Sequence, residues 1–188
     1  FTMRSAYPLE GLKAWRPAMQ VEGDALKAVY RDETFRNAVR AELAEPAGVR
    51  LFNGEWDKLA VTQVKREENR HLEHNSIAKL AVEAGADPLD WLLDFVISED
   101  LETVLTAILL NSDEEAVARI ITNPYASVAL SDAGAHLTFF CDAGFGLYLM
   151  GHWVRRKGVM SLERAVHELT GKPSGIYGIQ KRGYIALG

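Results

Sequence analysis

The sequence lacks any long apolar run and contains a single cysteine among its 188 residues. No stretch approaches the roughly 20 consecutive apolar residues of a membrane-spanning helix, so we expect no membrane partner. The one cysteine, Cys141, excludes an internal disulfide. Because free thiols persist in reducing compartments, this composition fits a cytoplasmic protein, which is the location we expect.

Positive charge is also scarce. The chain has 21 Lys and Arg against 26 Asp and Glu, a net charge of −5, which gives no electrostatic basis for binding nucleic acid. Neither a Gly-x-Gly-x-x-Gly nor a Walker sequence is present, so the sequence offers no nucleotide site. The content of 48% apolar and 25% charged residues is ordinary for a soluble globular protein with a sizeable core.

The stretch Ser127–His136 is the most informative part of the chain. A short apolar run, Val128-Ala129-Leu130, ends abruptly in Ser131-Asp132, which predicts a buried strand over residues 127–131. A carboxylate at the end of a buried strand needs a cation or hydrogen-bond donors, and functional sites of α/β folds gather at such strand ends. Asp132 is therefore the first candidate for chemistry, although capping of the following turn explains it equally well.

Strand and helix patterns alternate before this stretch. The hydrophobic run 103–110 predicts a strand buried on both faces. A capping box, Ser112-Asp-Glu-Glu115, opens a helix over 114–121, and the strand 127–131 follows. Strand, helix and strand with short connections form a βαβ unit, so we predict an α/β fold with a parallel sheet.

The upstream part reads as a loop-rich and helical segment over residues 1–48. Helical periodicity covers 24–45 with an interruption near Asp32. Strands are predicted at 49–52 and 59–64 across an Asn-Gly turn, and the charge run 65–70 predicts a solvated loop because its signs are mixed. Helix-capping residues and the glycines that end helices predict helices at 76–84 and 147–157, and two further helices that begin at residues 88 and 161.

Several motifs together resemble the amidohydrolase superfamily. Leu130-Ser-Asp-Ala-Gly-Ala-His136 is similar to the last-strand motif of the branch that contains the D-aminoacylases, or N-acyl-D-amino-acid deacylases. The resemblance extends over roughly the latter two-thirds of the chain. It includes Ser76–Ala81, Asp87–Asp90, Gly151–Arg155, Ser161–Val166, Leu169–Gly171 and Gly178–Gly183.

The resemblance implies a fold as well. It makes residues 49–183 the C-terminal portion of a (β/α)8 TIM-like barrel that includes the last strand, and 184–188 the start of a small β domain. A complete barrel takes about 250 residues, and the first-strand His-x-His of the family is absent from the sequence. We therefore expect a barrel portion truncated at both ends.

The function implied by the resemblance is metal-dependent hydrolysis of a linear, non-peptide C–N amide bond in a small acyl-amide substrate. Asp132 would bind zinc or another divalent metal and handle the proton of the attacking water, with the other ligands outside this chain. His136 would orient the substrate, and a loop histidine bonded to backbone is an equal alternative. One carboxylate is too few ligands for a catalytic zinc, so we expect the isolated chain to be inactive.

Other side chains are weaker candidates. The i, i+3 spacing of His71 and His74 suits two metal ligands on one helix face, but a polar loop explains them better. Cys141 with His136 or His152 as base would make a nucleophile. However, a lone cysteine is more often a small buried apolar group, and packing against the barrel is the favoured role of His152.

The loop after Asp132 departs from the family. Several deacylases carry basic residues there that suit a substrate carboxylate, whereas residues 137–151 contain no Lys or Arg and include Phe139, Phe140 and Phe145. This puts an acyl-amino-acid substrate in doubt and favours an apolar acyl or amide substrate.

The predicted partial barrel also bears on partners. Because a partial barrel cannot close its sheet, strand edges and apolar faces would be exposed. We therefore expect association with the missing N-terminal half or with a second copy. The alternative to an enzyme is a non-catalytic fragment or assembly module that needs the missing N-terminal half.

Overall fold

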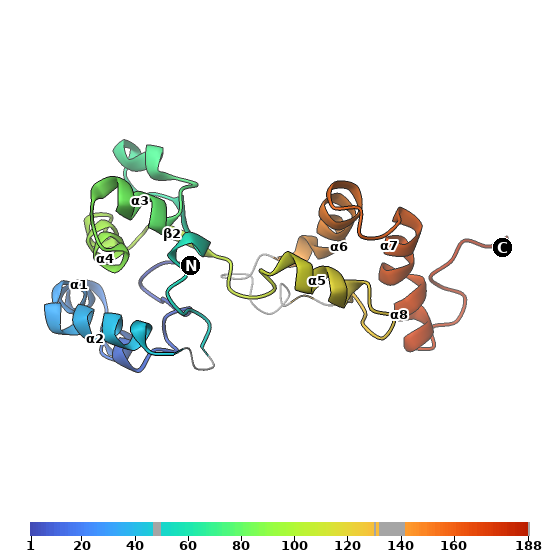
Figure 1. Cartoon of the computed structure of the whole chain (residues 1–188), viewed down its shortest axis with the longest axis horizontal. Helices are drawn as coiled ribbons and strands as arrows, with labels where there is room; N and C mark the ends of the chain where they lie inside the picture. The colour runs from blue at the N-terminus through green and yellow to red at the C-terminus, as the bar shows by residue number, and fades with distance from the viewer. Residues whose placement is uncertain (47–49, 130, 132–141, 188) are drawn as a thin grey trace. The chain divides into compact units, whose positions relative to one another are not determined.

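A computed structural model describes residues 1–46, 50–129, 131 and 142–187. The chain divides into two compact units, Phe1–Leu110 and Asn111–Gly188, and each is described by itself (Figure 1). Among the described residues, no helix is both long enough and apolar enough to cross a membrane.

The first unit is mainly helical. Its helices are η1 (Lys13–Trp15), η2 (Ala18–Gln20), α1 (Gly23–Arg31), α2 (Glu33–Ala44), η3 (Trp56–Lys58), η4 (Glu67–Leu72), α3 (Ile77–Ala84) and α4 (Pro88–Ser98). The side chains of Asp32, Ser76 and Asp87 accept hydrogen bonds from the first turns of α2, α3 and α4, as N-cap residues do. Gly85 ends α3 in the left-handed conformation, with φ 64°. These boundaries, including the helix break at Asp32, confirm the sequence predictions.

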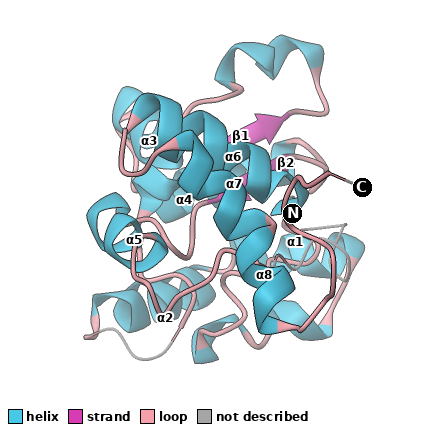
Figure 2. Cartoon of the chain, turned by 90° about the vertical axis from the view of Figure 1, so that its right-hand side faces the viewer, coloured by secondary structure: helices cyan, strands magenta, loops and turns pink. Residues whose placement is uncertain are grey.

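Two short strands complete this unit. β1 (Leu59–Gln63) and β2 (Val104–Ala107) pair antiparallel, with Leu59 opposite Ala107 and Val61 opposite Leu105. Figure 2 shows the two strands in magenta. Leu59, Val61 and Leu105 are buried, so the pair presents one face to the core of the unit.

An aromatic group lies within that core. The rings of Trp15, Tyr30 and Phe35 lie 5.2–6.0 Å apart between centroids. The Tyr30 hydroxyl donates a 2.7 Å hydrogen bond to the carbonyl oxygen of Met3, and burial raises the pKa of Tyr30. The loop-rich N-terminal residues are thereby fixed to α1 and α2, although they contain little regular structure.

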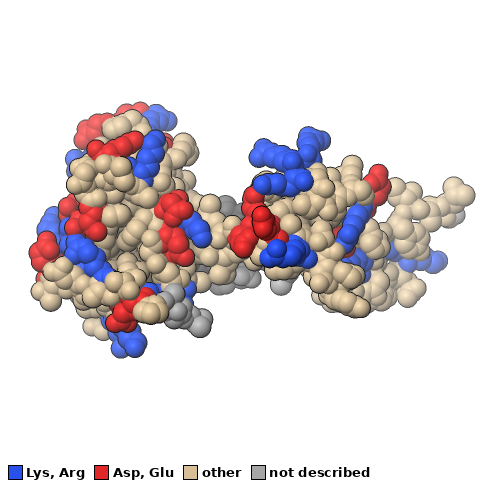
Figure 3. Space-filling view, viewed as in Figure 1, with Lys and Arg blue, Asp and Glu red and all other residues tan. Residues whose placement is uncertain are grey.

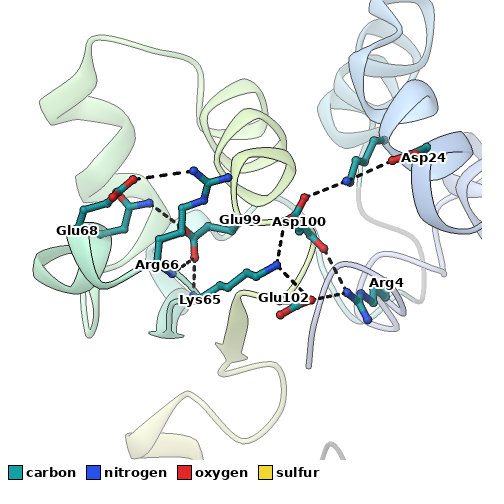
Figure 4. Close-up of polar contacts among 10 residues, drawn as sticks. Arg4, Asp24, Lys65, Arg66, Glu68, Glu99, Asp100 and Glu102 are labelled. Atoms are coloured by element: carbon teal, nitrogen blue, oxygen red, sulfur yellow. Dashed lines mark hydrogen bonds and ion pairs between the residues drawn. The ribbon is translucent and has the colours of Figure 1, made fainter.

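A buried carboxylate anchors the charge run that follows β1. Glu99 is fully buried, and its oxygens accept hydrogen bonds from the backbone N–H groups of Lys65 and Arg66 and from the Asn69 side chain (Figure 4). Three donors offset much of the cost of burying the charge. Residues 65–70 are therefore not simply a solvated loop, because their backbone binds Glu99 and η4 begins at Glu67.

The next residue, Asp100, makes ion pairs at the surface. Its oxygens lie 3.0 Å from Nζ of Lys27 and 2.8 Å from Nζ of Lys65 (Figure 4). These hydrogen bonds, with Lys65 contributing most, lower the pKa of Asp100 to about 2. The end of α4 is thus linked to α1 and to the residues after β1.

The second unit contains helices and a small core. Its elements are α5 (Glu114–Ile121), η6 (Asp142–Gly144), α6 (Phe145–Tyr148), the π-helix η7 (Leu149–Arg156), α7 (Leu162–Leu169) and α8 (Gly171–Ile176). The N-cap of α5 is Asp113, whose side chain accepts from Ala116 N–H, and Ser161 caps α7 as expected. Among its described residues, the buried apolar cluster consists of Leu149, Trp153, Met160 and Ala165.

The predicted portion of a TIM-like α/β barrel is wrong. The structure is about 53% helical, and its described part contains only the two-stranded antiparallel sheet. β2 occupies part of the predicted strand 103–110 but pairs with β1. Its continuation turns outward, leaving Ile108 and Leu110 exposed.

The strand predicted at 59–64 is confirmed as β1, whereas those predicted at 49–52 and 127–131 are wrong where the structure describes them. Residues 127–129 and 131 are not in a strand, and neither are residues 50–52. Val128 packs against the helical core of the second unit, and Phe52 is buried against Trp56, with ring centroids 4.8 Å apart. Ser127 and Ala129 are exposed and Val128 is only partly buried, so a short apolar run establishes neither a strand nor full burial of the segment.

Candidate functional site

The structure describes the residues that lead into and out of the segment around Asp132. Asp132, His136 and Cys141 lie outside the described residues, so their proposed roles stay predictions. The chain approaches this segment from α5 through residues 122–129, and beyond it resumes at η6. The contacts of these flanking parts define the candidate site.

Two positively charged side chains, one from α7 and one from α8, contact the residues that lead into this segment. Nη2 of Arg164 donates a 2.5 Å hydrogen bond to the carbonyl oxygen of Thr122, and Nζ of Lys172 donates to the carbonyl oxygen of Ala126. Both contacts are made to the main chain. They fix the course of residues 122–126 against the last two helices.

A buried carboxylate supports one of these cations. The Glu168 side chain is only 5% exposed, and one of its oxygens lies 2.8 Å from Nζ of Lys172. Because a buried carboxylate needs a cation, the pair fixes the ammonium group of Lys172 against the chain. Lys172 thus connects Glu168 to the backbone of Ala126, six residues before Asp132.

A contact between His152 and Glu114 links η7, which follows the segment around Asp132, to α5. Nε2 of His152 lies 2.8 Å from Oε1 of Glu114, and Lys157 contacts the other carboxylate oxygen. The His152 ring stacks on Tyr148, with 4.7 Å between centroids. The hydrogen bond from Lys157, with a smaller contribution from His152, lowers the pKa of Glu114. The expected packing of His152 against a barrel is wrong, because the described residues form no barrel, and its ring instead contacts Tyr148 and Glu114 of the second unit.

No metal centre forms among the described residues. No group of three or more His, Cys, Asp and Glu side chains in residues 1–46, 50–129, 131 and 142–187 is placed to hold an ion. His71 lies in η4, where its Nδ1 is 2.9 Å from the carbonyl oxygen of Glu68, whereas His74 follows that helix with φ 64°. The described residues therefore do not fit a zinc ion by themselves.

Sequence reasoning missed most of these contacts. Glu168 and Lys172 have the i, i+4 spacing of a helical ion pair, which is a usable signal. Glu114 and His152 are 38 residues apart, and nothing in their spacing predicts contact. A hydrogen bond from a side chain to a main-chain carbonyl oxygen cannot be predicted from the identity of the accepting residue, because every residue has that oxygen.

Comparisons with known proteins give distant relatives. The chain is similar to a protein of Mycobacterium bovis and to proteins of two strains of Mycobacterium tuberculosis, CDC 1551 and H37Rv, each named only as an uncharacterized protein. In each case the identity is 29% over 180 residues, which covers 87% of this chain and 29% of the relative. The chain thus spans less than a third of the length of the curated relatives it matches. No protein family and no solved structure matches the chain.

Proposed function

We propose that this chain is part of a metal-dependent amidohydrolase that cleaves a linear amide bond, similar to the N-acyl-D-amino-acid deacylases. The resemblance of Leu130–His136 to the family's aspartate motif carries this proposal. The lengths of the mycobacterial relatives are compatible with it, because they leave room outside the matching region for further ligands. We also propose a cytoplasmic location, because a chain with a single cysteine and no internal disulfide fits a reducing compartment.

In this proposal Asp132 takes the proton of the attacking water and returns it to the leaving amine. A bound zinc or similar divalent ion lowers the pKa of a coordinated water to about 7, and its remaining ligands come from outside this chain. His136 orients the small acyl-amide substrate. The contacts of Arg164 and Lys172 hold the main chain at Thr122 and Ala126, which precede Asp132 in the sequence.

The test uses the full-length protein that contains this chain. We expect Asp132→Asn to lose at least about a hundredfold in deacylase activity, as removal of an essential proton-transfer group does, and to bind less zinc by elemental analysis. Glu115→Gln is the matched control, since Glu115 is an exposed residue in the first turn of α5 and should retain activity and metal. Activity that survives both Asp132→Asn and chelation would refute the proposal.

A second candidate function is a non-catalytic assembly module, which associates with the rest of a longer chain or with a second copy. Exposed apolar side chains in the second unit favour it: Tyr125 is 98% exposed, and Leu147 and Tyr177 are each 75% exposed. Surfaces of this kind often mark interaction sites. A full-length protein that binds no metal and turns over no acyl amide, yet loses its assembly state when Tyr177 becomes Asp, would favour this candidate.

A further inference from the structure

A pocket of about 620 Å³ opens between α7, α8 and the C-terminal residues of the second unit. Its volume lies in the range typical of small-molecule sites. Much of the surface around α8 and the C-terminal residues is uncharged in Figure 3. The lining consists of Val166, Leu169, Thr170, Pro173, Ser174, Ile179, Arg182, Gly183, Tyr184 and Ile185.

Close backbone packing fixes the wall formed by the C-terminal residues. Gly183 has φ +83°, and a Cβ atom added to it would lie 2.8 Å from the Cα atom of Gly171 at the start of α8. The Ser174 hydroxyl lies 3.0 Å from the carbonyl oxygens of Ile179 and Arg182, to which it donates. Arg182 and the residues around it are thereby held beside α8 in a defined position.

Arg182 supplies the charge of this pocket. Nη1 donates to the carbonyl oxygen of Lys181 at 2.9 Å, and in the described part of the chain no partner is recorded for Nε or Nη2. The hydroxyls of Thr170 and Ser174 donate to main-chain carbonyls, so they are not free to donate to a ligand. None of the lining residues is acidic, and a guanidinium group recognises carboxylates through parallel hydrogen bonds.

The apolar walls of the pocket determine the chemical character of the part of the ligand that lies away from Arg182. Val166, Ile179 and Ile185 line the pocket, yet each remains at least 44% exposed. Covering such side chains with an apolar chain is favourable, at about 25 cal/mol per Å² removed from water. One cation beside an uncharged apolar groove is complementary to a molecule with one anionic end and one apolar body.

We propose that this pocket binds an amphipathic monocarboxylate, with its carboxylate on Arg182 and its alkyl or acyl chain along α7 and α8. This binding proposal is independent of the role predicted for Asp132. It does not depend on the proposed hydrolase function, because binding here requires neither metal nor turnover.

The experiment is isothermal titration of the 188-residue chain with laurate and with dodecanol, both below the concentrations at which they aggregate. We expect saturable binding of one laurate per chain, and about tenfold weaker binding of dodecanol, which lacks the charge-assisted hydrogen bonds. Arg182→Gln should weaken laurate binding about tenfold and leave dodecanol binding unchanged. Lys181→Gln is the matched control, since it removes the neighbouring positive charge outside the lining and should leave laurate binding within about twofold.

Three results would overturn the inference. The first is equal affinity for laurate and dodecanol in the unaltered chain, which needs no variant and so holds even if Arg182→Gln does not fold. The second is an equal loss of binding in Lys181→Gln, which would indicate attraction by net charge only. The third is sedimentation showing that a second copy of the chain fills the groove and that laurate does not displace it.

Discussion

At the scale of single residues, the hydroxyl of Thr103 is buried without a hydrogen-bond partner among the described residues. A buried hydroxyl without a partner destabilises the fold, and replacing it by a methyl group of the same shape removes that loss. We therefore expect Thr103→Val to leave the free energy of unfolding unchanged or to raise it by up to about 1 kcal/mol. Urea unfolding followed by circular dichroism measures this. A loss of more than about 1 kcal/mol would indicate that the hydroxyl is satisfied by a bound water.

Asp100 gives the first unit a defined response to acid. Its pKa is about 2 in the folded chain and about 3.9 in an unfolded chain, so between these values the unfolded state binds more protons. The stabilisation by the Lys65 and Lys27 pairs is therefore complete above about pH 4 and is lost as the pH falls towards 2.

The corresponding test compares the unaltered chain with Asp100→Asn from pH 5 to pH 2 by urea unfolding. Asparagine tolerates the left-handed backbone of this position, φ 55°. The stability difference should be largest at pH 5 and should shrink as the pH falls. Asp24→Asn serves as control, because Asp24 pairs with Lys27 from a 98% exposed side chain and should contribute little. A difference that stays constant with pH would contradict the prediction.

At the scale of elements, the contact between Gly183 and α8 should be sensitive to a single methyl group. Gly178 has φ +66° with nothing within 4 Å of an added Cβ, whereas Gly183 at φ +83° would place that atom 2.8 Å from Gly171. Both Ala substitutions carry the backbone penalty, but only Gly183→Ala adds overpacking, which typically costs about 1–3 kcal/mol. Hydrogen exchange should show faster opening of α8 in Gly183→Ala than in Gly178→Ala. Equal rates would mean that the C-terminal residues do not rest on α8.

Helix boundaries were predictable from the sequence because they depend on local chemistry. Asp32, Ser76, Asp87 and Ser161 each cap a helix through their own side chains, and the residues that determine each cap lie within one turn. The pairing of β1 with β2 was not predictable in this way. It joins Val61 to Leu105, and the choice of partner depends on the packing of α3 and α4, which separate the two strands in the sequence.

The candidate site likewise combines a local motif that the sequence shows with long-range contacts that it does not. The motif around Asp132 is visible in the sequence, but the contacts that frame it join helices far apart in the chain. His152 and Glu114 come together only because η7 packs beside α5. Arg182 belongs to the motif Gly178–Gly183, but the sequence predicts no role for it, since only the fold places it beside the apolar residues of α7 and α8.

At the scale of the whole molecule, the two units should differ in stability. The first buries a large continuous apolar cluster, whereas the buried apolar cluster among the described residues of the second consists of Leu149, Trp153, Met160 and Ala165. Each large buried side chain contributes about 1.5–3 kcal/mol, so the described cluster of the second unit supplies less hydrophobic stabilisation than the cluster of the first. We expect amides of α7 to exchange at least tenfold faster than those of α4 in the 188-residue chain. Equal protection would show that the two units unfold together.

The contacts of Arg164 and Lys172 have a consequence for how this protein varies during evolution. Both side chains bind carbonyl oxygens, and every amino acid at positions 122 and 126 provides one. Natural variants can therefore replace Thr122 and Ala126 freely while positions 164 and 172 remain basic, and no paired substitutions arise. Methods that infer spatial proximity from coupled changes across an alignment will therefore not detect this link, although it holds residues 122–126 to α7 and α8.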